Sequence, residues 1–293
     1  MPPKNETAFE ELSIVARDGR PLAATLAHPA DEIRGAIVVL GAVGAPRSYY
    51  RAFAAYAATR GFAVLLGDYR GCGDSLLGEG RRREQLRRDP ATLRDWVLRD
   101  APAFVAALAG RFPGLPLHGI GHSLGGQTFT LIDEIERFSS VTVVTAGSGD
   151  LRSYPPHLRA LYTAQLTAVI PLIALFGYTP GWLGLRYDLP AGVVAEWSRW
   201  CRTRGYVAGV FPERPFPRPI PSTIPLRFFD VADDRIAPPP ATEALRRLYD
   251  APHQTHRVVT ASEFARKSFG HFGPFRPFAA PLWDALLPPV RDR

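Results

Sequence analysis

Short, fully apolar runs alternate along this chain with segments that have helical spacing. Residues 36–40 and 63–66 contain no polar side chain, which is typical of strands buried on both faces of a sheet. Between them, residues 48–60 carry apolar positions at helical spacing and are followed by Gly61, a residue type that often ends helices. Strands that alternate with helices predict a mostly parallel, doubly wound α/β sheet. Further strands are expected at residues 117–120, 141–145, 225–229 and 256–259.

The start of the chain predicts an antiparallel pair instead. Residues 9–16 and 21–28 are β-rich and are joined across Asp18-Gly19, a strong hairpin signal. Two more helices are expected at residues 94–109 and 124–138, from their spacing of apolar positions.

One connection is too long for a simple crossover. Roughly 75 residues without a strand signal separate Ala146 from Pro225. We therefore expect a helical insertion over residues 153–206, lying as a cap over the carboxyl edge of the sheet, where open α/β sheets bind ligands. The predicted division is a core domain of residues 1–150 and 212–293 with a cap of residues 151–211.

Composition changes this picture little. The chain has 293 residues, 46% apolar and 22% charged, as in an ordinary globular protein. The polar N-terminus favours a cytoplasmic location over secretion. Residues 166–176 form the longest lipid-like stretch, but Pro171 interrupts it and a spanning helix needs about 20 apolar residues, so no stable membrane insertion is expected. The sequence leaves open whether the protein forms a homodimer.

The net charge of +7 is carried mostly by arginine, and residues 81–88 hold its densest run. This run has no interleaved aromatic residues, so we interpret it as a solvated face and expect no nucleic-acid partner. Cys72 and Cys201 lie far apart and in no metal-ligand spacing. We expect no metal and no cofactor.

The strongest chemical signal is the segment from Gly121 to Gly126, which reads Gly-His-Ser-Leu-Gly-Gly. It fits G-x-S-x-G between a buried strand and a helix, which is the context that this motif requires. The sharp turn exposes the hydroxyl of Ser123 at the sheet edge, and the positive end of the following helix faces it. Ser123 is therefore the predicted nucleophile.

A serine hydroxyl needs a base, and the base needs an acid to orient it. His271 lies in a glycine-flanked loop after the last strand and is the preferred base. His253 and His256 also come late in the chain, but they lie in or beside that strand, where their side chains are less free to reach Ser123.

The acid is expected just after the penultimate strand, where Asp233 and Asp234 compete. Asp234 precedes a basic residue, two apolar residues and proline, and is the preferred triad acid. Asp233 would then hold the loop by accepting hydrogen bonds from backbone amides. Asp150, after the preceding strand, is a third candidate.

Acyl transfer also needs donors that face the developing oxyanion. The backbone amide of Leu124, directly after the nucleophile, is one. The second is expected in the loop after the first parallel strand, with Ala42 as the first choice and Val43 as the next.

Together these segments resemble the α/β-hydrolase superfamily, and within it the serine-aminopeptidase and monoglyceride-lipase-like hydrolases. The turn from Asp68 to Ser75 is similar to the D-x-R-G-x-G-x-S segment of that group, and residues 121–126 and 270–272 are similar to its nucleophile and histidine segments. The resemblance implies an α/β-hydrolase fold with an inserted helical cap. Many relatives have His-Gly where this chain has Leu40-Gly41, which leaves the oxyanion geometry less defined.

The resemblance and the residues together predict a carboxylesterase-like serine hydrolase. Its partner would be a small-molecule ester or acyl substrate of moderate hydrophobicity, cleaved through an acyl-enzyme on Ser123. An acyltransferase or an amide or peptide hydrolase could use the same triad. A non-catalytic binding protein on the same fold is the remaining alternative.

Overall fold

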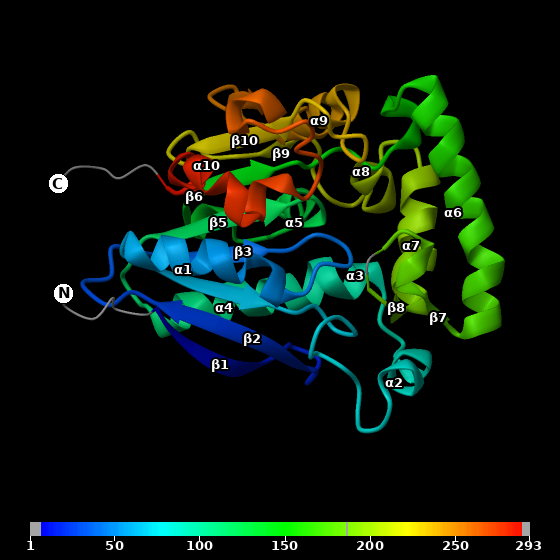
Figure 1. The fold of residues 1–293 in the computed structure, drawn as a ribbon, viewed down its shortest axis with the longest axis horizontal. Helices are drawn as coiled ribbons and strands as arrows, with labels where there is room; N and C mark the ends of the chain where they lie inside the picture. The colour runs from blue at the N-terminus through cyan, green and yellow to red at the C-terminus, as the bar shows by residue number, and fades with distance from the viewer. Residues whose placement is uncertain (1–6, 186, 289–293) are drawn as a thin grey trace.

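A central sheet of eight strands organises the computed structural model, which describes residues 7–185 and 187–288 (Figure 1). The strand order is β1-β2-β4-β3-β5-β6-β10-β12. β1 pairs antiparallel with β2 and β2 pairs antiparallel with β4, whereas all other neighbours run parallel. The predicted doubly wound, mostly parallel sheet is confirmed. Its strands are Ala8–Val15, Pro21–His28, Phe62–Gly67, Gly35–Leu40, Leu117–His122, Phe138–Val144, Leu226–Val231 and Thr255–Val259, in sheet order.

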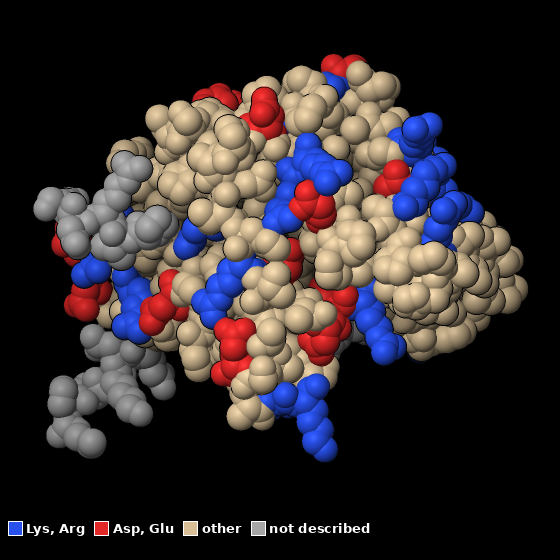
Figure 2. Space-filling model, turned by 90° about the horizontal axis from the view of Figure 1, so that it is seen from above, with Lys and Arg blue, Asp and Glu red and all other residues tan. Residues whose placement is uncertain are grey.

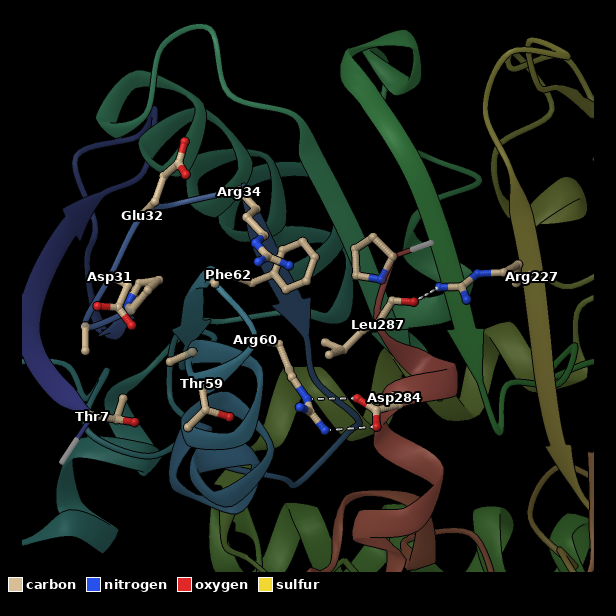
Figure 3. Close-up of a pocket in the computed structure, with 15 residues that line it drawn as sticks. Thr7, Asp31, Glu32, Arg34, Thr59, Arg60, Phe62, Arg227, Asp284 and Leu287 are labelled. Carbon is tan, nitrogen blue, oxygen red and sulfur yellow. Dashed lines mark hydrogen bonds and ion pairs between the residues drawn. The ribbon is translucent and has the colours of Figure 1, made fainter. Parts of the chain in front are cut away.

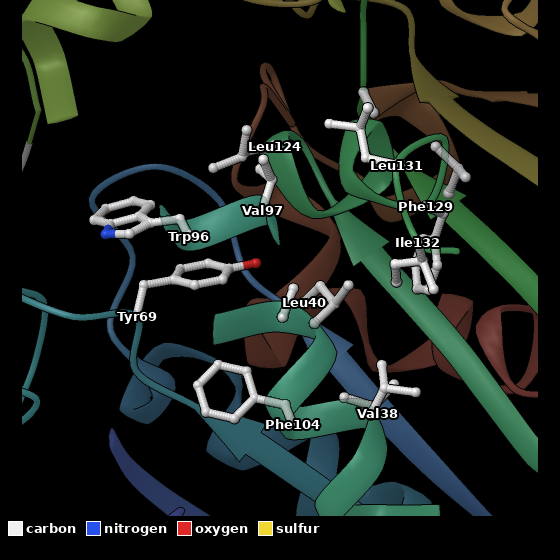
Figure 4. Packing of buried hydrophobic residues seen from close by; sticks show 14 of the residues in the cluster. Val38, Leu40, Tyr69, Trp96, Val97, Phe104, Leu124, Phe129, Leu131 and Ile132 are labelled. Atoms are coloured by element: carbon white, nitrogen blue, oxygen red, sulfur yellow. The ribbon is translucent and has the colours of Figure 1, made fainter. Parts of the chain in front are cut away.

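Both faces of the sheet are buried, which explains the unbroken apolar runs. In β3 the side chains of Val38 and Leu40 join one core and those of Ile37 and Val39 join the other, because successive side chains of a strand point to opposite faces. Figure 4 shows the first core, where Val38 and Leu40 lie near the rings that cover this face. Those rings are Tyr69, Trp96 and Phe104.

Helices cover the two faces separately (Figure 1). α1 (Arg51–Thr59) and α10 (Ala280–Leu286) pack on one face, and α4 (Ala101–Arg111) packs on the other. The helix expected at residues 94–109 is found as α3 (Leu93–Asp95), a π-helical turn and α4 in succession. The remaining helix of the core, α9 (Pro239–Arg246), follows β10.

The helix expected at residues 124–138 is wrong in length. α5 covers only Leu124–Thr128, and β6 already begins at Phe138. The segment between them gives its carbonyls to arginine side chains from a distant part of the chain. Arg214 donates to Leu131 O at 2.9 Å, and Arg218 donates to Ile132 O at 3.1 Å and Asp133 O at 2.9 Å. These long-range donors take the place of the backbone amides that would donate to the same carbonyls in a continued helix. No local sequence pattern predicts them.

The long connection between β6 and β10 adds no strand to the central sheet within its described residues. It contains α6 (Pro156–Phe176), α7 (Ala191–Arg202) and α8 (Val207–Val210), with the short pair β7 (Tyr178–Thr179) and β8 (Leu189–Pro190). Figure 1 shows these helices at one end of the sheet, beyond the carboxyl ends of its parallel strands. The division at residues 150 and 212 stays a prediction.

Pro171 does not break α6, contrary to the sequence-based expectation. The helix continues through it to a length of 21 residues. A proline inside a helix removes one backbone hydrogen bond and costs about 3 kcal/mol. Val169 and Ile173, on either side of Pro171, are both buried against the core, and this packing keeps the helix continuous.

Candidate active site

Ser123 lies between the end of β5 and the first residue of α5. Its φ of 54° and ψ of −114° are strained for a residue with a side chain. The turn closes only because its neighbours are glycines. A Cβ at Gly125 would lie 1.9 Å from Leu40 O, and one at Gly121 would lie 2.5 Å from the carbonyl carbon of Gly125. The strain keeps the hydroxyl at the sheet edge, where Ser123 is half-buried among buried neighbours.

Asp234 and His271 meet at the same edge. The Nδ1 of His271 lies 2.7 Å from Oδ2 of Asp234, and both side chains are buried. Asp234 Oδ1 accepts hydrogen bonds from the amides of Ile236 and Ala237 at 2.8 and 3.0 Å, which fixes the carboxylate in its loop. A carboxylate on Nδ1 leaves Nε2 as the ring nitrogen that can accept a proton.

Hydrogen bonds hold the loop of His271 against the turn of Ser123. Nε2 of His122, the residue before Ser123, donates to the carbonyl of His271 at 3.0 Å, and Thr145 Oγ1 donates to the same oxygen at 3.1 Å. The rings of His122 and His271 lie 5.2 Å apart between centroids. The hydroxyl of Ser123 makes no hydrogen bond with any described residue. In ligand-free sites such catalytic hydrogen bonds are often long and tighten when substrate binds.

The competing acids have other partners. Asp233 accepts hydrogen bonds from Ser268 Oγ at 2.7 Å and from the amides of Phe269 and Gly270 at 3.0 Å each. Burial alone would raise the pKa of Asp233, but these hydrogen bonds outweigh it and hold the pKa below its ordinary value. Asp233 therefore anchors the loop that carries His271, instead of contacting the imidazole.

The other candidates lie apart from His271. Asp150 accepts from the amides of Arg152 and Gly205 at 2.9 and 2.7 Å, and so joins two parts of the connection between β6 and β10. His256 contacts Asp230 at 2.7 Å, and His253 contacts Ile224 O at 2.9 Å.

A directed chain of hydrogen bonds runs behind the site. The Ala42 amide donates to the hydroxyl of Tyr50 at 2.9 Å, and that hydroxyl lies 2.8 Å from Nδ1 of His122. Because Nε2 of His122 faces a carbonyl, the ring carries its proton there, and Nδ1 accepts from Tyr50. Burial first, and the neighbouring His271 second, hold the pKa of His122 well below its ordinary value. Burial likewise raises the pKa of Tyr50 well above its ordinary value.

The hydrogen bond between the Ala42 amide and Tyr50 contradicts the choice of Ala42 as an oxyanion donor. Its amide is buried and already satisfied by Tyr50, so it does not face a substrate. The amide of Val43, the second choice, makes no hydrogen bond within the part of the chain that the structure describes. Leu124, as the first residue of α5, has an amide without an intrahelical acceptor. The tyrosine lies eight residues from Ala42 inside a helical pattern, and only tertiary structure brings its hydroxyl to the loop.

The long connection between β6 and β10 contacts both loops of the site. A Cβ at Gly44 would lie 2.5 Å from Leu185 O, so the backbone of this connection lies directly against the loop that holds Val43. Tyr162 and Tyr154 donate to the carbonyls of Arg235 and Ile236 at 2.9 Å each, immediately after Asp234.

A large cavity of about 790 Å³ lies elsewhere, at the amino ends of β3 and β4 (Figure 3). Its described lining contains no serine, cysteine or histidine. Arg60 is paired there with Asp284 at 3.0 Å, and Arg227 donates to Leu287 O at 2.7 Å. These two arginines thus hold α10 and the residues after it against α1 and β10. No group of three His, Cys, Asp or Glu side chains that could hold a metal ion occurs among the described residues.

Comparisons with known proteins agree with this fold. The chain resembles a hypothetical protein, PA2218, from Pseudomonas aeruginosa (17% identity, TM-score 0.61, covering 98% of this chain and 96% of that one). It also resembles a soluble variant of monoglyceride lipase from Saccharomyces cerevisiae (16%, TM-score 0.58, covering 88% and 89%) and a carboxyl esterase from Bacillus coagulans (15%, TM-score 0.56, covering 86% and 90%). These likenesses show the fold. A search of curated proteins gives no match. The model of the alpha/beta hydrolase family matches residues 37–288, and the chain belongs to that family.

Proposed function

We propose that this protein is a serine hydrolase that cleaves carboxylic esters through an acyl-enzyme on Ser123. The observation that carries the proposal is the contact of 2.7 Å between His271 and Asp234, beside a strained serine turn. Membership of a hydrolase family and the similarity in fold to a carboxyl esterase and a monoglyceride lipase support it.

In this mechanism Nε2 of His271 takes the proton of the Ser123 hydroxyl as its oxygen attacks the ester carbonyl. Asp234 holds the tautomer and stabilises the imidazolium that forms. The amides of Val43 and Leu124 donate to the oxyanion. The imidazolium then protonates the leaving alcohol, and a water molecule, deprotonated by the same nitrogen, releases the acid.

The cap favours a small to medium, moderately hydrophobic ester. Its backbone lies against the loop of Val43 at Gly44, and Tyr154 and Tyr162 bind the carbonyls that follow Asp234. A substrate must therefore fit between the reacting groups and an aromatic, largely uncharged cover.

The test combines a fluorophosphonate probe with p-nitrophenyl esters of increasing acyl length. We expect the probe to label wild type and not Ser123→Ala, and Ser123→Ala to lose ester turnover by about three orders of magnitude or more. Ser222→Ala, at an exposed serine, is the matched control and should keep both properties. Equal turnover by wild type and Ser123→Ala would refute the proposal. Added alcohol that diverts the acyl group to a new ester would indicate acyl transfer in place of hydrolysis.

A further inference from the structure

α6 turns an uncharged, largely apolar surface outward. The helix is long and apolar enough to cross a membrane by length and composition, with a mean hydropathy of 1.5, yet only 17% of that stretch is buried. From Ala160 to Phe176 the helix has no charged residue. Leu175 is 76% exposed, and Trp182, which packs edge-on against Phe176, is 70% exposed. Exposed apolar surface of this kind marks an interaction site in soluble proteins. The apolar members of this surface include Leu161, Ile170, Pro171, Ala174, Leu175 and Trp182, and the uncharged Thr163 and Thr167 are exposed on the same helix.

Arginines border this α6 face at both ends. At its C-terminal end α2 (Arg82–Arg88) packs beside the helix, and Arg87 Nε donates to Phe176 O at 2.9 Å. Arg83 and Arg88 are exposed on the same short helix. At the N-terminal end Arg159 is exposed. Figure 2 shows this end of the molecule, at the right, as a broad area of uncharged residues with Lys and Arg gathered along its edge.

We propose that the α6 face docks onto the surface of an anionic lipid bilayer. Apolar side chains would enter the boundary between headgroups and acyl chains, and the bordering guanidinium groups would meet lipid phosphates. The helix lies in this interface and does not cross it, because Leu158, Val169 and Ile173 on its other side are buried against the protein. The proposal concerns binding and does not depend on the esterase chemistry.

Charge favours a lipid surface over a second copy of the chain. In an antiparallel pair of α6 helices, each about 31 Å long, Arg159 of one copy would approach the arginines of α2 in the other. Like charges held together in this way oppose association. An anionic bilayer instead attracts both ends of the face at once, and also the net charge of +7.

The binding test uses vesicles of phosphatidylcholine alone and vesicles with an equal part of phosphatidylglycerol. In a flotation assay, we expect wild type to bind the anionic vesicles, to bind neutral vesicles more weakly, and to be released in part by high salt. The double variant Leu175→Glu/Trp182→Glu should bind the anionic vesicles at least about tenfold more weakly, since it removes apolar burial and adds repulsion. The control Val15→Glu/Val258→Glu changes two exposed apolar residues on β1 and β12, remote from α6, and should bind like wild type.

A second readout locates the contact. Trp182, at 70% exposure, is the one exposed tryptophan among the described residues; Trp197 is half-buried, and Trp96, Trp200 and Trp283 are buried. Anionic vesicles should therefore shift the tryptophan emission of wild type to the blue, and Trp182→Phe should remove the shift while it retains flotation. Wild type that floats with neither vesicle, or equally with both, would overturn the proposal. Flotation of the α6 double variant equal to that of the control would also overturn it. A dimer in solution that this double variant dissociates would assign the face to a second copy instead.

Discussion

At the scale of the residue, the chain of hydrogen bonds from Ala42 through Tyr50 and His122 to His271 joins three loops. One loop contains Val43, one contains Ser123 and one carries the imidazole. Each link is buried, so neither end can exchange its partner for water. The hydrogen bonds require a neutral His122, because a second proton on Nδ1 would remove the acceptor of the Tyr50 hydroxyl.

Tyr50→Phe tests this arrangement. It leaves the Ala42 amide and Nδ1 of His122 buried without partners, which costs about 1–3 kcal/mol for each unsatisfied group. We expect a lower free energy of unfolding in urea, and a fall in kcat that exceeds the change in KM. Tyr56→Phe is the control, because that hydroxyl contacts Arg60 at the surface. Equal effects of the two substitutions would contradict the role of Tyr50.

Asp233 gives a prediction with a pH signature. Its folded pKa lies below the unfolded value, so its stabilisation is complete above the unfolded pKa of about 4. The stabilisation is lost as the pH falls through the folded pKa. Asp233→Asn should therefore lower Tm at neutral pH, and the difference from wild type should narrow below about pH 4. Asp31→Asn, at an exposed carboxylate without a described hydrogen bond, should leave Tm unchanged both at neutral pH and below about pH 4. A constant difference across this range would exclude the carboxylate charge as the cause.

At the scale of the element, α6 shows where tertiary packing overrides local preference. Pro171 is exposed on the outer face, so its ring costs one hydrogen bond without disturbing the buried side of the helix. Pro171→Ala should restore that hydrogen bond and raise the free energy of unfolding by about 1–3 kcal/mol. Alanine also gives the unfolded chain more conformational freedom, which offsets part of this gain. Urea denaturation measures this change. A destabilised variant would show that the proline is needed for the helix path. Ala168→Pro should be strongly destabilising, since it removes a second backbone hydrogen bond from the same helix.

The elements also show which parts of the structure the sequence could predict. All eight strands of the sheet were expected. Burial on both faces leaves continuous apolar runs in central strands such as β3 and β4, and Asp18-Gly19 marks the first hairpin. The shortened α5 was not expected, because its end depends on Arg214 and Arg218, which lie some eighty residues further along the chain. In the site, Asp234 and His271 were expected from loop chemistry and order. Tyr50 and His122 were not, because their partners are set by the packing of three loops.

At the scale of the whole molecule, the connection between β6 and β10 is joined to the rest of the protein where the loop of Asp234 leaves the sheet. Tyr154 and Tyr162 come from this connection, and their acceptors are the two carbonyls that follow Asp234 by one and two residues. The hydroxyls are therefore part of the support that holds the carboxylate against His271. Tyr162 thus links α6 directly to the loop of Asp234.

Removal of both hydroxyls tests this coupling. Tyr154→Phe/Tyr162→Phe keeps both rings, so the cap should stay packed while the acid loop loses two neutral hydrogen bonds. Each of these hydrogen bonds contributes about 0.5–1.5 kcal/mol, and part of this loss appears as poorer orientation of His271. We therefore expect kcat/KM for a short ester to fall about three- to tenfold. Tyr187→Phe, at a cap tyrosine whose hydroxyl makes no hydrogen bond with a described residue, should match wild type. If the double variant also matches wild type with a short ester, the acid loop is held by the amides of Ile236 and Ala237 alone, and the cap serves only to cover the substrate.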